Sequence, residues 1–110
     1  MLDLALRAIA EPTRREILRL VQDSELPAGQ IASRFDVTRP AISQHLRVLA
    51  DAGLVTVRRD GTRLLYRARP EGLEALRQYL DSFWAQGLQR LKQAAEQDEE
   101  RSHGRSGLIE

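Results

Sequence analysis

Residues 38–63 read TRPAISQHLRVLADAGLVTVRRDGTR, and this stretch carries the clearest signals of secondary structure in the chain. Thr38 is a good N-cap for a helix, and Pro40 follows in the first helical turn, where proline is tolerated. Gly53 suits the left-handed position that ends many helices. These signals predict a helix over residues 39–51.

This helix has one apolar face and one polar face. Its apolar side chains recur at spacings of four and three residues and are Ile42, Leu46 and Leu49. They fall within about 40° of one another around a helix of 3.6 residues per turn, so this face is expected to be buried. The side chains on the opposite face are Pro40, Ser43, Gln44 and Arg47. His45 lies at the boundary, where its ring either packs against the core or contacts a ligand.

The outward side chains are of the types that read DNA. Glutamine can pair bidentately with adenine, serine contacts bases or phosphates, and arginine takes a phosphate or a guanine. A three-residue turn at 36–38 and a short helix over 27–35 precede this helix, which is the order of a helix-turn-helix motif. The alternative is an ordinary amphipathic surface helix.

The period of the apolar pattern changes to two after Gly53. Apolar and polar side chains alternate on both sides of Asp60-Gly61, a strong hairpin-turn signal. We therefore expect a β-hairpin over residues 55–68, with one apolar and one arginine-rich face. The arginines that flank its turn are Arg58, Arg59 and Arg63. They suit a narrow minor groove of DNA, or alternatively keep a solvated edge hairpin from pairing with other strands.

Further helices are predicted on both sides of this unit. Residues 2–9 carry an apolar stripe, and Thr13 with Glu16 three residues later forms a capping box that begins the next helix. Leucines and aromatic residues recur at threes and fours over 70–95, which predicts a helix about 39 Å long. The fold class is thus mainly α, with about five helices and a two-stranded wing.

A helix of this length exceeds the radius of gyration of about 13 Å expected for such a domain. Part of its apolar stripe is therefore expected to pack on a second subunit. The side chains assigned to this dimer interface lie in the first and last helices: Leu2, Leu6, Leu76, Leu80, Phe83, Trp84, Leu88 and Leu91. An aromatic-lined small-molecule pocket at Phe83 and Trp84 is the alternative. Residues 1–97 are expected to form one domain, and residues 98–110 a disordered polar tail.

Composition excludes several classes of protein. The 110 residues include no cysteine, which excludes disulfide scaffolds, thiolate zinc sites, iron–sulfur clusters and cysteine nucleophiles. No apolar run reaches the roughly 18 residues of a membrane span, and the N-terminus does not resemble a signal peptide, so a cytoplasmic location is expected. The net charge is only +1, but residues 55–70 carry five arginines against one aspartate, as a surface for a polyanion would.

Catalysis finds no support in the sequence. An enzyme of this size needs a nucleophile with a base, paired buried acids or a metal. The imidazoles available are His45, in the presumed DNA-reading helix, and His103, in the tail. No phosphate-binding loop of the GxxxxGK type is present. The chain is therefore not expected to be an enzyme.

Several stretches together resemble the ArsR (arsenic-repressor) family of winged helix-turn-helix regulators. They are residues 10–18 (AEPTRREIL), 38–49, 52–55 and 58–63, and the resemblance covers about residues 5–95. It implies a bacterial or archaeal homodimer that pairs through its first and last helices and represses transcription from palindromic operators. The DNA-binding residues that we assign are Thr38, Arg39, Pro40, Ser43, Gln44, His45, Arg47, Arg58, Arg59 and Arg63.

The chain departs from the metal-sensing members of that family. Those members carry a Cys-x-Cys pair where this sequence has Pro27 and Gly29, and neither residue can ligate through a side chain. Residues 70–97 contain no histidine, so the family's other metal site also lacks its ligands. The resemblance therefore points to the metal-independent branch, with no cofactor, no metal and an unknown small-molecule effector. The competing hypothesis is a winged-helix module whose arginines bind an acidic protein, and retention on duplex DNA would discriminate between the two.

Overall fold

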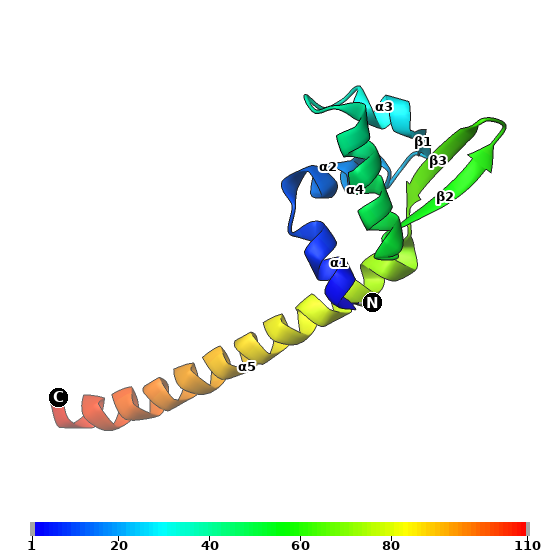
Figure 1. Ribbon diagram of the computed structural model, residues 1–110. Helices are drawn as coiled ribbons and strands as arrows, with labels where there is room; N and C mark the ends of the chain where they lie inside the picture. Colours follow the sequence, from blue (N-terminus) through cyan, green and yellow to red (C-terminus); the bar gives the residue numbers. More distant parts are fainter. Residues whose placement is uncertain (1, 110) are drawn as a thin grey trace. The chain divides into compact units, whose positions relative to one another are not determined.

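The computed structural model describes the backbone of residues 2–109 and the side chains of residues 2–98. Its elements, in chain order, are α1 (Leu2–Ile9), α2 (Pro12–Leu20), β1 (Leu26–Pro27), α3 (Ala28–Ala32), α4 (Arg39–Asp51), β2 (Val55–Asp60), β3 (Arg63–Ala68) and α5 (Pro70–Ile109) (Figure 1). The predicted fold, mainly helical with a hairpin wing, is confirmed. The chain divides into two compact units, Met1–Leu76 and Arg77–Glu110, which are described separately.

The first unit has a core of aliphatic side chains drawn from α1 to α4, the strands and the first turns of α5. Its fully buried large side chains are Ile17, Val21, Ile31, Ile42, Leu46, Leu49 and Leu54. The three apolar positions that the sequence assigned to the inner face of α4 are all among them. Burial of this face fixes the rotation of α4 about its axis, so its opposite face must point to solvent.

Thr38 caps α4 as predicted, because its hydroxyl accepts a hydrogen bond from the backbone N–H of Ala41 at 3.3 Å. The predicted cap of α2 was wrong. The N-cap is Glu11 rather than Thr13, and the Glu11 carboxylate accepts from the backbone N–H of Arg14 at 3.0 Å. A carboxylate can take this role because it accepts the unpaired N–H groups of the first turn and carries the favoured charge there.

The wing belongs to a three-stranded sheet of order β1-β3-β2, one strand more than predicted. Leu26 pairs with Tyr66 and Pro27 with Leu65, so the segment expected to begin a helix at 27 is extended before α3. The helix itself is shorter than predicted and ends at Ala32. Proline at 27 explains the change, since it tolerates an extended backbone at a sheet edge and precedes the first helical residue.

The hairpin turn lies one residue later than Asp60-Gly61. Asp60 pairs with Arg63, so Gly61 and Thr62 form the two-residue loop. Gly61 has a φ of 66°, which a residue without a β-carbon adopts readily. Val57 and Leu64, on the face predicted to be apolar, stay about two-fifths exposed because the hairpin extends past the core.

The end of α4 packs tightly against the start of α5. Gly53 has a φ of 74°, as expected for the residue that ends α4. A β-carbon added to Gly72 would overlap the Gly53 carbonyl oxygen. Glycine at 72 therefore allows the two backbones to approach.

The second unit is the continuation of α5. The helix extends to Ile109, beyond the end near residue 95 that the sequence predicted. Within the described residues, no helix is long and apolar enough to cross a membrane.

Candidate nucleic-acid interface

The solvent face of α4 carries the side chains that the sequence assigned to DNA. Thr38, Arg39, Pro40, Ser43, Gln44 and Arg47 are all exposed. They are polar or small, whereas the side chains on the opposite face of the helix are buried. This surface offers hydrogen-bond donors and acceptors to solvent.

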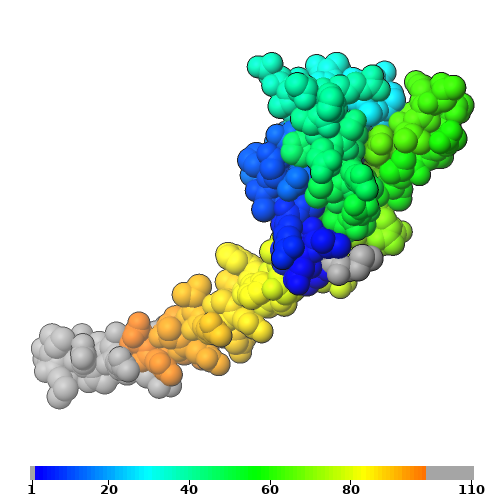
Figure 2. Space-filling view, viewed as in Figure 1, coloured from blue at the N-terminus to red at the C-terminus, as the bar shows by residue number. Residues whose placement is uncertain are grey.

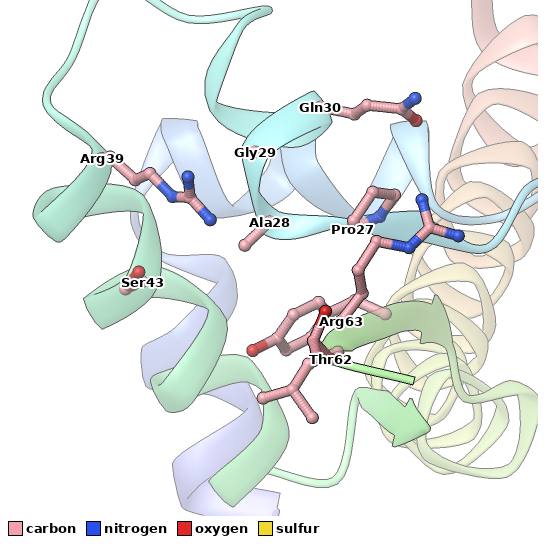
Figure 3. Close-up of a pocket in the computed structure, with 10 residues that line it drawn as sticks. Pro27, Ala28, Gly29, Gln30, Arg39, Ser43, Thr62 and Arg63 are labelled. Atoms are coloured by element: carbon pink, nitrogen blue, oxygen red, sulfur yellow. The ribbon is translucent and has the colours of Figure 1, made fainter. Parts of the chain in front are cut away.

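A groove of about 600 Å³ lies between α3, the start of α4 and the wing. Its polar lining comes from all three elements: Gln30, Arg39, Ser43, Thr62, Arg63 and Tyr66. Figure 3 shows the Arg39 side chain running from α4 toward α3, with Thr62 and Arg63 on the wing side. Figure 2 shows the wing protruding beside α3 and α4. The fold thus brings Arg39, Ser43 and Arg63 to one concave surface, as the predicted interface requires.

Gly29 on α3 lies beside the guanidinium of Arg39. A β-carbon at position 29 would lie 3.6 Å from Nη1 of Arg39, in van der Waals contact with the guanidinium. A larger side chain would compete with the guanidinium for this volume. Arg39 is therefore directed along the groove wall by the neighbouring helix.

A bidentate ion pair links the wing to the segment before β1. Arg58 on β2 donates to both carboxylate oxygens of Glu25, from Nη2 at 2.6 Å and from Nε at 3.0 and 3.3 Å. The hydrogen bonds and charge of Arg58 hold the pKa of Glu25 below its ordinary value against the effect of burial, and Glu25 in turn raises the pKa of Arg58. Arg58 therefore fastens β2 to the segment before β1.

The other two wing arginines differ from Arg58. Nη2 of Arg63 lies 3.5 Å from the Asp60 carboxylate, a loose pair across the turn that leaves the guanidinium more than half exposed. Arg59 is exposed and makes no hydrogen bond or ion pair with any described residue. Of the three, Arg59 and Arg63 are the more available to an external anion.

His45 lies apart from the groove. Its side chain is about one-fifth exposed, and its Nδ1 lies 3.3 Å from Nη1 of Arg14 and 3.9 Å from the Glu11 carboxylate. Arg14 belongs to α2 and Glu11 is the N-cap of that helix, which packs against α4 in the body of the unit. The predicted contact of His45 with DNA therefore stays a prediction, beside the alternative of a packing role.

Sequence reasoning missed Gln30, Thr62 and Tyr66 as groove residues. Gln30 is an exposed polar residue on the helix that precedes the turn, and this position could have indicated that it lines the groove. Thr62 and Tyr66 face the groove only because of the hairpin register. That register depended on the exact place of the turn.

The side chains assigned to a dimer interface fall into two groups. Leu76 is buried in the core of the first unit, and Leu2 and Leu6 are partly buried against that core. In the second unit the α5 stripe is largely uncovered: Leu80 is 47% exposed, Phe83 56%, Trp84 69%, Leu88 48% and Leu91 68%. Phe83 contacts Tyr79 edge to face, with ring centroids 4.9 Å apart.

Metal-binding clusters are also absent from the part of the chain with described side chains. No group of three or more His, Cys, Asp or Glu residues there is placed to hold an ion. Pro27 and Gly29, at the places of the family's cysteine pair, lie in β1 and α3.

Comparisons with known proteins agree with this geometry. A family model for a helix-turn-helix domain matches residues 9–58. The chain is 46% identical, over 86 residues, to the HTH-type transcriptional regulator Rv2034 of Mycobacterium tuberculosis, and the match covers 78% of this chain and 80% of that protein. It is 36% identical, over 76 residues, to the arsenical resistance operon repressor of Staphylococcus xylosus, covering 69% of this chain and 73% of the repressor.

A solved structure extends the likeness to a dimer. The homodimeric winged helix-turn-helix DNA-binding domain of Mb0332 from Mycobacterium bovis, described as a possible ArsR-family regulator, matches with a TM-score of 0.62. It is 29% identical, and the match covers 76% of this chain and 77% of that one. With its winged helix-turn-helix fold and these relatives, the chain belongs to the ArsR family of winged helix-turn-helix transcriptional regulators.

Proposed function

We propose that this protein is a homodimeric repressor that binds a palindromic DNA operator, with α4 in the major groove and the β2–β3 hairpin as a wing on the flanking DNA. The observation that carries the proposal is the groove in which Arg39 and Ser43 of α4 face Arg63 of the wing. Arginines there can hold the phosphate backbone while Ser43 and Gln44 reach base edges.

A homodimer is supported by the α5 stripe. Leu80, Phe83, Trp84, Leu88 and Leu91 present a row of large apolar side chains that a second copy could cover. One of the similar solved structures is homodimeric. Monomeric proteins rarely leave such a patch in water, so pairing accounts for it better than solvent exposure does.

Regulation without a metal is part of the proposal. The chain has no cysteine, and the positions of the family's cysteine pair are occupied by proline and glycine. We also place the protein in the cytoplasm, where an operator would be accessible.

The test is fluorescence anisotropy with a labelled duplex selected by the protein from a random-sequence library. Excess unselected duplex competes, and the salt concentration is varied. Competitor-resistant binding with a steep salt dependence is expected of a specific regulator. Equal affinity for selected and unselected duplexes would contradict the proposal and favour an acidic protein partner.

Gln44→Ala sharpens this test at one base-reading position. We expect loss of about 1–3 kcal/mol of specific binding and little change on unselected DNA, because one bidentate base contact disappears. Gln22→Ala is the control, at an exposed glutamine that does not line the groove. An equal loss on both kinds of DNA would show that Gln44 does not read a base.

A further inference from the structure

The end of α1 meets the start of α2 at a cluster built around Arg14. Nε of Arg14 donates to the carbonyl oxygen of Ala8 at 2.7 Å, and Nη2 donates to that of Arg7 at 3.2 Å. The last carbonyls of a helix lack partners within it, and a cation is favoured beside them. Arg14 therefore caps the C-terminal end of α1.

The third nitrogen of the same guanidinium reaches α4. Nη1 of Arg14 lies 3.3 Å from Nδ1 of His45. Arginine stays protonated and carries donors only, so Nδ1 has to be the acceptor. This requires a neutral imidazole with its proton on Nε2.

In the described part of the chain, two charged groups face the ring, one from α2 and one from the N-cap residue before it. Arg14 is the nearer, and the Glu11 carboxylate lies 3.9 Å from Nδ1. Although burial opposes the shift, the hydrogen bond from the backbone N–H of Arg14 lowers the pKa of Glu11. From α1 the cluster receives the carbonyls of Arg7 and Ala8, both held by Arg14.

We propose that Arg14 and His45 are a positioning pair for α4, in which one guanidinium ties the end of α1 to the helix that carries the DNA-reading side chains. The inference rests on the proposed function for its effect on DNA binding. Figure 1 shows α2 beside α4, on the side away from the wing. The pair thus contacts α4 on the side that packs against α2, whereas Ser43 and Gln44 stay exposed on its solvent face.

The pair makes DNA binding sensitive to acid in a defined direction. Protonated His45 would carry a donor at Nδ1 opposite the Arg14 donor, and two positive charges would meet. The ring then either turns toward Glu11 or leaves the cluster, and the Arg14 link is lost in both cases. Affinity for DNA should therefore fall as the imidazole is protonated. A histidine that contacted phosphate directly would give the opposite sign, because protonation would strengthen its attraction to DNA.

The experiment compares the full chain with His45→Gln, which keeps an acceptor but does not titrate, and with His45→Leu, which removes the acceptor. His103→Gln is the control, since it removes the other histidine of the chain. Anisotropy with the selected duplex is measured between about pH 5.5 and pH 8, the range in which histidine changes charge. Arg14→Lys tests the other partner, because lysine keeps the positive charge but lacks the planar guanidinium that donates to several acceptors at once. Thermal unfolding of each variant reports whether it folds.

One hydrogen bond corresponds to roughly a 2- to 12-fold change in affinity. We expect the affinity of the wild type and of His103→Gln to fall by about this factor on acidification. We expect His45→Gln to bind like the wild type near pH 8 with a flat profile, and His45→Leu to bind more weakly throughout. Affinity that rises on acidification in the wild type but not in His45→Gln, or an unchanged His45→Leu, would overturn the inference.

Imidazole ¹⁵N chemical shifts of the free protein test the pair without DNA. They should show that His45 carries its proton on Nε2 near pH 8, and a proton on Nδ1 would overturn the assignment. If the proposed function itself is wrong, the wild type will show no preference for the selected duplex at any pH. That result differs from a failure of the Arg14–His45 pair alone, so the two can be distinguished.

Discussion

The two units of this chain bury their apolar side chains to very different degrees. In residues 1–76, Ile42, Leu46 and Leu49 on α4 are completely shielded from solvent. In the helical unit that follows, Trp84 is 69% and Leu91 is 68% exposed. The contrast indicates that the first unit is stabilised by its own core, whereas the second carries apolar surface that becomes stabilising only when another chain covers it.

One leucine-to-alanine change in each unit tests this difference with the largest expected effect. Leu46→Ala should lower the free energy of unfolding by about 2–5 kcal/mol at any protein concentration, because it empties a filled site. Leu91→Ala should matter only where dimers persist, so its effect should fade on dilution. Urea unfolding at several protein concentrations checks both. A concentration-independent cost for Leu91→Ala would mean that the stripe is buried within one chain.

A charge within the stripe tests the same difference through assembly. Trp84→Glu should cost at least about 2 kcal/mol of dimer stability, since buried aromatic residues are frequent hot spots of interfaces and the new carboxylate would lose its hydration there. Gln89→Glu adds the same charge on the far side of the helix and should leave the dimer intact. Sedimentation velocity gives the mass of each. A dimeric Trp84→Glu would remove this stripe from the interface.

Gly72→Ala tests whether the start of α5 packs as part of the first unit. The added methyl would overlap the Gly53 carbonyl oxygen, so the two backbones have to move apart. We expect a loss of about 1–3 kcal/mol in the free energy of unfolding, as for other overpacked sites. Gly87→Ala, where a β-carbon meets open space, is the matched control and should not destabilise. Equal effects of the two changes would contradict the close contact.

The smallest expected effect concerns the ion pair at the wing. Because the pKa of Glu25 is lowered in the folded chain, the pair stabilises the fold above the ordinary glutamate pKa of about 4.3, and this contribution is lost as the pH falls through the folded value. Glu25→Gln should therefore unfold slightly more easily than the wild type near neutral pH, and the difference should vanish in acid. A difference that persists in acid would mean that the charge is not its cause.

The features that the sequence predicted correctly are those set by residues close together in the chain. The cap at Thr38, the buried positions of α4 and the glycine after it are each decided by neighbours in the chain. β1 was missed because two residues carry no periodicity, and their extended conformation comes from pairing with β3. The links from Arg14 to His45 and from Glu25 to Arg58 join residues 31 and 33 positions apart, so they depend on the tertiary fold. The groove likewise required the register of the hairpin.

In the proposed complex, two copies of this chain place two α4 helices on one operator. Hydroxyl-radical footprinting on the selected duplex tests this arrangement. We predict two protected half-sites related by a dyad, with centres one helical turn or roughly 10 base pairs apart, and loss of that pattern in Trp84→Glu. A single protected segment without a dyad, or a full pattern in a monomeric variant, would contradict the account.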